Sequence, residues 1–330
     1  MNEEKLRVAL IWGGQGRERG VSEKGKEHIL PLINENTHDL LSIFIDPEGR
    51  WLLEDREVVP HQKGFLCPED GRHYPVDCAF PLLHGDFGED GIVQGALECA
   101  GIPYVGCDVA AGAVCRDKAL VKAVAQSLGV PTLPYLVAFR EEGVAYALRH
   151  AEEELCYPMF VKPTSLGSSV GVAAADTKDE LRSALEGAFA LSRKVIIEPR
   201  LIHKRELECG YFSTKGKEIF TNPGEILCEG LYGYKEKYTP GCARVAVRAE
   251  LSDDLCQRVR DHSRAMVRQL GIRDLARVDF FLSEGEIYLN EINTMPGFTD
   301  GSLYAAMIGG HGICESRLIE LLISGAVARG

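Results

Sequence analysis

Two acidic residues and an asparagine near the end of the chain lie inside apolar runs, where charged side chains are uncommon. Residues 277–293 read RVDFFLSEGEIYLNEIN, which is two strand patterns flanking a polar turn. Alternation along the second strand puts Glu291 and Asn293 on one face. A three-residue loop, 284–286, would place Asp279 opposite Glu291. We therefore expect two carboxylates and a carboxamide to converge, a set of oxygen ligands that suits Mg²⁺.

An alternative is that these residues are solvated strand charges. It explains Glu284 and Glu286, which belong to the turn by composition. It does not explain Asp279 and Glu291, because apolar residues surround both of them in the sequence. The choice between the two interpretations depends on the register of the hairpin, which the sequence alone does not fix.

A lysine at a predicted strand end precedes a Gly/Ser-rich loop in the stretch FVKPTSLGSSVG, residues 160–171. Backbone N–H groups of such a loop can cradle phosphates, while Lys162 adds a point charge. The stretch is neither a P-loop nor a dinucleotide fingerprint, and alone it also suits an ordinary surface hairpin. Lys118, at a predicted helix start, is a second candidate for phosphate binding or a solvated helix charge.

The elements that must position these residues fall into three parts. In residues 1–113, strands and helices alternate, which predicts an open α/β (Rossmann-like) domain. In such sheets ligands bind at the carboxyl ends of strands, where Gly13-Gly14 and His84-Gly85 fall. Residues 114–200 predict a small α+β domain that carries the Gly/Ser loop, and residues 201–330 a third domain with the acidic hairpin. The expected strands are 7–12, 40–45, 77–83, 103–105, 135–139, 159–162, 170–174 and 194–198, and the expected helices are 22–32, 91–100, 117–128, 143–155 and 252–270.

Composition limits the classes of partner. The 330 residues suit two or three domains, and 37 basic against 49 acidic residues give a net charge of −12. Such a surface repels nucleic acid and anionic membrane, so we expect neither as a partner. No apolar run approaches the roughly 18 residues of a spanning helix. The 11 cysteines form no CxxC pair, which favours free thiols in a reducing, cytoplasmic setting.

Eight motifs occur in a fixed order along residues 13–307. They are GG…ERxVS, LLHGxxGEDGxxQG, YVGCD…DK, FVKP…GSSVG, IIE…REL, YxYKEKY, ARVDFF and EINTMPGFTDGSL. In these motifs the chain resembles the D-alanine–D-alanine ligases of the ATP-grasp superfamily. The resemblance implies an ATP-grasp fold behind the N-terminal α/β domain. It also implies a homodimer and ATP-dependent joining of two D-alanine molecules, through an acylphosphate, for peptidoglycan precursor synthesis.

The resemblance also implies roles on the ATP side of the site. Asp279, Glu291 and Asn293 would hold two Mg²⁺ ions, or Mn²⁺ in their place, with Glu291 bridging. Lys118 and Lys162 would contact the ATP phosphates. The adenine would lie against residues 198–201, and the ribose hydroxyls would bind an acid farther along the same segment. The residues implied here beyond those above are Glu198, Leu201 and Glu206.

On the amino-acid side, Glu18 resembles the acid that holds the ammonium of the first D-alanine. Its implied partners in a lid are Ser168, from segment 165–169, and Tyr238, from segment 231–238. The other implied roles are the transferred phosphate for Lys237, the tetrahedral intermediate for Arg277 and the Gly297 amide, the second substrate for Ser302 and Leu303, and the first substrate or a purely structural position for His84. The chain departs from the family pattern at Gly20, Arg116, Gly233 and Ala305-Ala306.

Two further functions stay open. Relatives that make D-alanyl-D-lactate or D-alanyl-D-serine share these motifs. Tyr238 argues against the lactate type, and Leu303 argues against the serine type, in which an arginine commonly follows that serine. The other alternative is a non-catalytic nucleotide-binding protein. The presence of the three metal-ligand candidates and both phosphate lysines argues against it.

Overall fold

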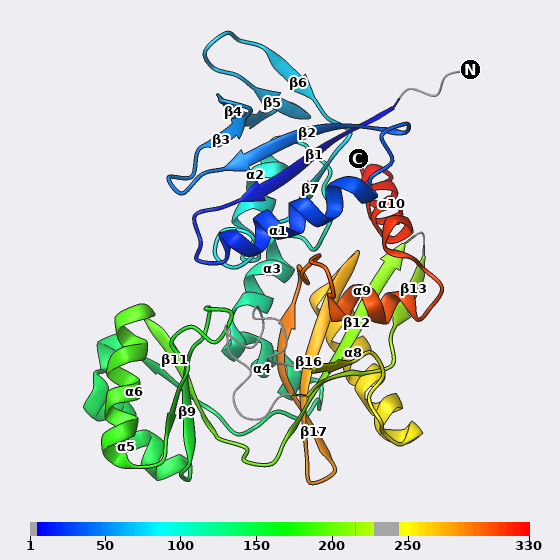
Figure 1. Cartoon of the computed structure of the whole chain (residues 1–330). Helices are drawn as coiled ribbons and strands as arrows, with labels where there is room; N and C mark the ends of the chain where they lie inside the picture. Colours follow the sequence, from blue (N-terminus) through cyan, green and yellow to red (C-terminus); the bar gives the residue numbers. More distant parts are fainter. Residues whose placement is uncertain (1–4, 215, 228–243) are drawn as a thin grey trace.

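The computed structural model describes residues 5–214, 216–227 and 244–330, which form three sheets with helices packed against them (Figure 1). The first sheet has seven strands in the order β6-β5-β4-β3-β2-β1-β7. Its buried strand β1 (Leu6–Gly13) runs parallel to both β2 (His38–Ile45) and β7 (Cys78–Pro81). Helices α1 (Arg19–Ile29) and α2 (Ile92–Cys99) accompany these strands, and the short helix η1 (Leu30–Leu32) follows α1. The predicted α/β pattern is therefore present in this part.

The same sheet contains four strands that the sequence interpretation missed. They pair antiparallel in succession outward from β2. Each has only three to six residues, which is too short to give a clear alternating pattern. Their bounds are β3 (Trp51–Leu53), β4 (Arg56–His61), β5 (Gly64–Leu66) and β6 (His73–Pro75).

The second sheet, in the order β10-β9-β11-β8, is packed against two helices that share its core. Strand β9 (Met159–Pro163) ends just after Lys162, as predicted, and leads into the Gly/Ser loop. Thr177 caps the N-terminus of helix α6 (Lys178–Leu191), because its side chain accepts a hydrogen bond from the Glu180 N–H. The other elements are β8 (Leu136–Phe139), η2 (Arg140–Glu142), α5 (Val144–Glu154), β10 (Ala173–Ala175), α6 (Lys178–Leu191) and β11 (Lys194–Pro199).

The third sheet, in the order β15-β14-β12-β16-β17 with β13 paired to β12, carries the acidic hairpin. Helix α8 (Asp253–Leu270) starts at the Ser252 cap and shares a core with this sheet. Helices α3 (Val109–Arg116) and α4 (Lys118–Ser127) belong to the same core, although the sequence interpretation placed 117–128 with the second part. The strands are β12 (Arg205–Thr214), β13 (Lys217–Phe220), β14 (Gly224–Leu227), β15 (Arg244–Ala246), β16 (Leu275–Ser283) and β17 (Glu286–Asn293).

The C-terminal segment returns to the first sheet. Helix α9 (Leu303–Gly309) packs on β12, and α10 (Glu315–Val327) lies beside β7, so that one core contains residues from both ends of the chain. Figure 1 shows α10 in red next to the blue N-terminal strands. Among the described residues, no helix is both long enough and apolar enough to span a bilayer.

The acidic hairpin corrects one prediction and explains another. The loop has two residues, Glu284 and Gly285, instead of the three expected, because Ser283 pairs with Glu286. Both loop residues have positive φ, as a tight primed turn requires. The tight turn alone would set Asp279 opposite Asn290. A bulge shifts the register between Asp279 and Phe280, and the expected pairing of Asp279 with Glu291 results.

Candidate active site

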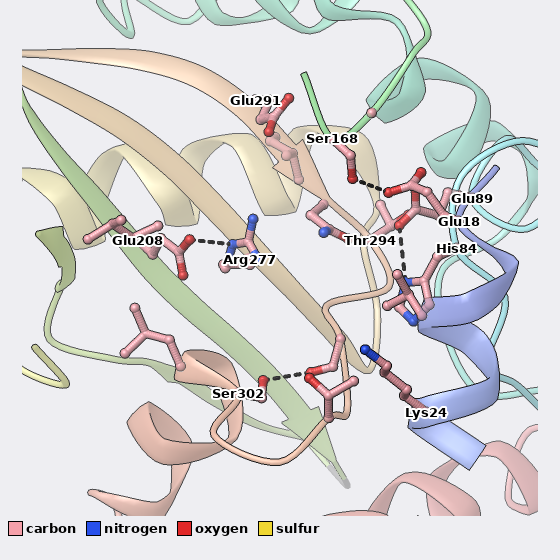
Figure 2. A pocket seen from close by; sticks show the side chains of 18 of the residues that line it. Glu18, Lys24, His84, Glu89, Ser168, Glu208, Arg277, Glu291, Thr294 and Ser302 are labelled. Carbon is pink, nitrogen blue, oxygen red and sulfur yellow. Dashed lines mark hydrogen bonds and ion pairs between the residues drawn. The ribbon is translucent and has the colours of Figure 1, made fainter. Parts of the chain in front are cut away.

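A cavity of about 800 Å³ lies where the first and third sheets meet the Gly/Ser loop (Figure 2). Figure 2 shows that its labelled side chains come from α1 and the residue before it, the segment after β7, the Gly/Ser loop, β12, the hairpin with the residue after it, and the residue before α9. All of the described residues that the sequence assigned to the amino-acid side line this cavity, together with three of those assigned to the ATP side, Lys118, Glu291 and Asn293. These are Glu18, His84, Lys118, Ser168, Arg277, Glu291, Asn293, Gly297, Ser302 and Leu303.

Two of the candidate metal ligands, Asp279 and Glu291, form ion pairs with basic side chains in this structure. Arg277 donates from Nε and Nη2 to the two carboxylate oxygens of Asp279, each at 2.7 Å. Lys118 Nζ lies 3.2 Å from Glu291 Oε2. Asn293 accepts the Met295 N–H through Oδ1 at 3.0 Å. These cations occupy the places where a divalent ion would neutralise the two acids.

The donor set fits Mg²⁺ only with help from other ligands. In the described part of the chain no three or more His, Cys, Asp or Glu side chains form a metal-binding group. An ion at the hairpin would therefore rely on Asp279, Glu291 and the Asn293 oxygen, and complete its shell with water or phosphate oxygens. That pattern is typical of Mg²⁺, which keeps several waters and binds substrate phosphates.

Arg277 is held by acids on two strands. Besides Asp279 it contacts Glu208 of β12, with 3.2 Å between Nε and Glu208 Oε1. Burial alone would lower the pKa of Arg277, but the carboxylates of Asp279 and Glu208 raise it well above its usual value. Arg277 is therefore a fixed positive charge at the hairpin, held by two acids in this structure.

The phosphate lysines border a second, smaller cavity of about 100 Å³ that adjoins the first. Lys118, at the start of α4, lines both cavities and donates from Nζ to the Leu166 carbonyl of the loop at 3.0 Å. Lys162 lines the second cavity from the end of β9. Both lysines thus lie at the junction between the loop and the cavities, where phosphates would bind.

Glu198 takes a different place from the one expected. Its side chain is 1 % exposed and bonds Lys162 and Lys122, each at 2.6 Å. Burial would raise the pKa of Glu198, but the two lysines lower it to about 2. The carboxylate therefore stays charged and fixes Lys162. Pro199 and Leu201, next along the chain, do line the second cavity.

Glu206, the expected ribose acid, also lines the second cavity. It accepts a hydrogen bond from Lys204 Nζ at 2.7 Å, and Lys204 in turn lies 4.1 Å from the centre of the Phe281 ring. Phe160 and Phe281 provide apolar walls in the same cavity. The same cavity is also lined by charged side chains, among them Lys162 and Glu291, so apolar and charged surfaces that could serve the base and the phosphates of a nucleotide adjoin each other.

The Gly/Ser loop contacts α1 directly. The Ser168 hydroxyl donates a hydrogen bond to the carboxylate of Glu18, the residue before α1 (Figure 2). Ser168 and Ser169 have φ values of 51° and 59°, a conformation that side chains other than glycine adopt at a cost. The contact between Glu18 and Ser168 therefore places a strained loop against one wall of the cavity.

His84 and Glu89 form the wall behind Glu18. His84 Nδ1 lies 3.9 Å from Glu89 Oε1, and His84 Nε2 is buried without a hydrogen-bond partner in the described part of the chain. Burial lowers the pKa of His84 to about 4, against the opposing charge of Glu18. Burial raises the pKa of Glu89 to about 7, although Arg116 opposes the shift. A neutral imidazole with an unpartnered nitrogen is suited to meet a substrate atom.

The far end of the large cavity combines one hydroxyl with an apolar wall. The Ser302 hydroxyl donates to the Gly297 carbonyl at 2.6 Å (Figure 2). Leu303, the next residue, packs with Ile226 and Met307 in a small apolar cluster. A carboxylate could therefore take the Ser302 proton, while a group facing Leu303 would find no polar partner on that side chain.

Two predicted residues, Lys237 and Tyr238, lie outside the described residues, as does the second lid segment 231–238. The sequence interpretation missed three residues, Lys122, Glu208 and Glu89, and the contacts made by Arg116. Lys122 stands one helical turn after Lys118, and Glu208 is an acid inside an apolar strand. Both features can be seen in the sequence, but neither identifies the residue that the side chain contacts.

Comparison with known proteins agrees with this geometry. Residues 7–107 match the family described as D-ala D-ala ligase N-terminus, and residues 124–324 match D-ala D-ala ligase C-terminus. The D-alanine–D-alanine ligase of Solibacter usitatus is 39% identical, over 98% of this chain and 96% of that protein.

Solved structures agree in fold over the whole length. D-alanyl-alanine synthetase A from Vibrio cholerae has a TM-score of 0.89 at 29% identity, over 99% of both chains. The VanG D-Ala:D-Ser ligase from Enterococcus faecalis has 0.86 at 33% identity, over 97% of this chain and 99% of the other. A Bacillus anthracis D-alanine–D-alanine ligase complexed with ATP has 0.78 at 28%, over 98% of both. With the ATP-grasp fold, two adjoining cavities and these matches, the chain belongs to the D-alanine–D-alanine ligase family.

Proposed function

We propose that this protein joins two D-alanine molecules with consumption of ATP. One observation carries the proposal. A single cavity holds an acid under a lid at one end, at Glu18, and a hydroxyl beside an apolar wall at the other, at Ser302. Arg277 and the acidic hairpin lie between them, where the cavity meets the lysine-lined one. Two amino acids and a nucleotide can therefore meet at one point.

The ends of the cavity suit two zwitterions in opposite orientations. An ammonium group bonds to a carboxylate such as Glu18, and its own carboxylate then faces the phosphate lysines. The carboxylate of a second amino acid can accept the Ser302 hydroxyl, and this leaves its amine facing the first molecule. Such an arrangement holds the reacting groups in order without free rotation.

The reaction needs ATP because an amine does not displace the oxygen of a carboxylate. The first carboxylate attacks the γ-phosphorus, ADP leaves, and an acylphosphate forms. The second molecule, once its ammonium group has lost a proton to solvent, attacks the acyl carbon through its free amine; phosphate then leaves with the C–O electron pair, and the nitrogen gives up one more proton to leave the neutral amide. Lys118 and Lys162 offset phosphate charge in the first step, and Arg277 offsets the oxyanion in the second.

Magnesium, when bound at the hairpin, would neutralise phosphoryl oxygens during the transfer. Asp279, Glu291 and Asn293 would hold it, and Arg277 and Lys118 would have to release the two acids. Release of Arg277 from Asp279 would also free its guanidinium for the intermediate. We propose Mg²⁺ as the resident ion because all three candidate donors are hard oxygens.

A D-alanine–D-serine ligase is the second candidate, because VanG is 33% identical to this chain over nearly its full length. The apolar cluster of Leu303, Ile226 and Met307 favours D-alanine instead. A hydroxyl against these side chains would lose water without gaining a partner, at a cost of about 1–3 kcal/mol. Burial of a methyl group there carries no such cost.

The test is a competition assay with the purified full chain, ATP and Mg²⁺. D-alanine, D-serine and D-lactate are supplied at equal concentration, and the products are identified by mass spectrometry. We expect D-alanyl-D-alanine as the main product, with stoichiometric ADP. D-alanyl-D-serine as the main product would refute D-alanine as the second substrate. ATP binding without formation of ADP or dipeptide would favour the non-catalytic alternative.

We also propose a homodimer and a cytosolic setting, on family resemblance and on the nine free cysteines of the described residues. Light scattering of the purified protein across a hundredfold range of concentration tests the dimer. A mass of about 36 kDa throughout would refute it, since that is the mass of one chain.

A further inference from the structure

Arg116 is a nearly buried cation at a place where the family pattern commonly has methionine. It is the last residue of α3, its side chain is 11% exposed, and it lines the large cavity. The proposed reaction gives it no role, because its hydrogen bonds go to Asp86 and Glu89 and not to a candidate metal ligand or phosphate lysine. Its hydrogen-bond partners, however, belong to the loop that lies against Glu18.

Arg116 ties together the segment that follows β7. Its Nη2 donates to Asp86 Oδ1 at 2.9 Å, and its Nη1 donates to Glu89 Oε2 at 3.2 Å. The same Glu89 oxygen accepts the Gly85 N–H at 3.1 Å. The guanidinium of Arg116 thus links α3 to the loop 84–89 through two acidic side chains.

This loop is one of two backbone surfaces that enclose Glu18. A Cβ built on Gly85 would collide with Glu18 Oε2, so the loop backbone lies directly against that carboxylate. The other surface is the lid. A Cβ on Gly167 would lie 3.0 Å from Glu18 Oε2 and 3.2 Å from Arg116 Nη1. Gly167 is therefore squeezed between the acid and the arginine.

Charge gives Arg116 a reason to be there. Glu18, Asp86 and Glu89 place three acids around one small volume. Burial raises the pKa of Glu89, the charge of Arg116 opposes that rise, and the charge of Glu18 adds to it. A methionine in place of Arg116 would leave the Glu89 carboxylate with only the Gly85 N–H among these partners. The loop against Glu18 would then lose the side-chain hydrogen bonds that Arg116 makes to it from α3.

We propose that Arg116 is a positioning residue for the first amino acid, because it holds the loop 84–89 on one side of Glu18 and lies against the Gly/Ser loop at Gly167 on the other. The carboxylate that receives the ammonium group is thereby fixed before the substrate arrives. The inference rests on the proposed function, since it takes Glu18 as the ammonium site. It adds a residue to that site that acts through its neighbours and does not touch the substrate.

The experiment compares Arg116→Met, Arg116→Lys and a matched control, Arg268→Met. Arg268 also stands in the last turn of a helix and makes an ion pair, with Glu218 at 2.7 Å, but it is exposed and distant from the cavities. Initial rates over a wide range of D-alanine concentration give separate KM values for the first and second sites. A third titration gives the KM for ATP.

We expect Arg116→Met to raise the KM of the first site by about tenfold or more, with the other two KM values within about twofold of the unaltered protein. Arg116→Lys keeps one cation and should recover most of the loss. Arg268→Met should match the unaltered protein throughout. Equal changes in all three KM values, or no change in any, would overturn the inference, because a merely structural arginine does not select one site.

The proposed function is judged separately. If the unaltered protein makes no dipeptide, that function fails. D-alanine binding in the presence of ADP is then measured by calorimetry on the same three variants. A first-site affinity that falls only in Arg116→Met upholds the positioning role, and equal affinity in all variants refutes it. Should Arg116→Met fail to fold, the lysine variant decides. Its single ammonium cannot bond Asp86 and Glu89 as the guanidinium does, so a small rise of about two- to threefold in the first-site KM alone would uphold the positioning role, and no rise would refute it.

Discussion

The two sides of the active site are built by different means. On the nucleotide side, Lys162 is fixed by a buried acid, Glu198, that also holds Lys122 within the core. On the amino-acid side, Glu18 meets Ser168 across the cavity, on a loop with positive φ at two serines. The nucleotide side is fixed by buried ion pairs in the core. The amino-acid side is closed by a hydrogen bond between Glu18 and a loop. This contrast fits a reaction in which ATP binds to a ready site, and water must then be excluded from a reactive acylphosphate.

Glu291 lies on the boundary between these two sides and lines both cavities. We predict that Glu291→Ala lowers turnover by at least about a thousandfold, since phosphoryl transfer depends on its metal. Stability should change by less than about 1 kcal/mol, because the ion pair of Glu291 with Lys118 is partly exposed. Rates of ADP release and urea unfolding test both parts.

The matched control is Glu286→Ala, at the turn of the same hairpin. Glu286 pairs with Arg258 at 3.0 Å and is more than half exposed. Its removal should leave turnover unchanged. Near-normal turnover in folded Glu291→Ala would refute the metal assignment.

Glu198 sharpens the contrast on the nucleotide side. We predict that Glu198→Gln destabilises the protein by about 3–5 kcal/mol, because Lys122 and Lys162 would be buried without a compensating charge. Free energies of unfolding in urea measure it. A loss below about 1 kcal/mol would contradict the view that folding sets this side.

The ion pairs of Glu198 with Lys122 and Lys162 also predict that the stability of the protein depends on pH. The folded-state pKa of Glu198 is about 2, below the usual value, so its contribution is present above pH 4.5 and is lost as the pH falls toward 2. The stability gap between Glu198→Gln and the unaltered protein should therefore narrow over that interval. A gap that stays constant from pH 6 to pH 3 would exclude a charge effect.

Ser168 tests the other side. Ser168→Ala should raise the KM for the first amino acid by about tenfold, because Glu18 loses its contact with the lid. Stability should stay within about 0.5 kcal/mol, since the loop is strained and partly exposed. An unfolding loss as large as that of Glu198→Gln would erase the contrast between the two sides.

The sequence predicted the convergence of Asp279 and Glu291, but by an incorrect route. Acids inside apolar runs showed that both residues belong to one site. The bulge at the hairpin could not be read, because the backbone geometry that shifts the register leaves no mark in an alternating pattern. Two errors, a loop one residue too long and a missing bulge, cancelled.

The contacts that fix the site were harder to predict. Glu198 was assigned to the adenine side because its motif says nothing of a partner 76 positions away, Lys122. Arg116 was recognised only as a departure from the family pattern. Its function as a link follows from two acids, Asp86 and Glu89, that fold back onto α3. Motifs identify which residues react, whereas tertiary contacts decide which residues hold them.

The smallest effect we predict concerns the far end of the amino-acid side. The unaltered enzyme should prefer D-alanine over D-serine at the second site by about 10- to 100-fold in kcat/KM, because Leu303 offers a D-serine hydroxyl no partner. Leu303→Arg should narrow that preference by about tenfold or less. A guanidinium can donate to the hydroxyl, but it must extend into the cavity, away from Ile226 and Met307, which pack around Leu303. Leu303→Met keeps the apolar wall and should leave the preference unchanged. Measurement of kcat/KM for both acceptors in all three proteins decides the matter, and an equal preference in Leu303→Arg would place the discrimination elsewhere in the cavity.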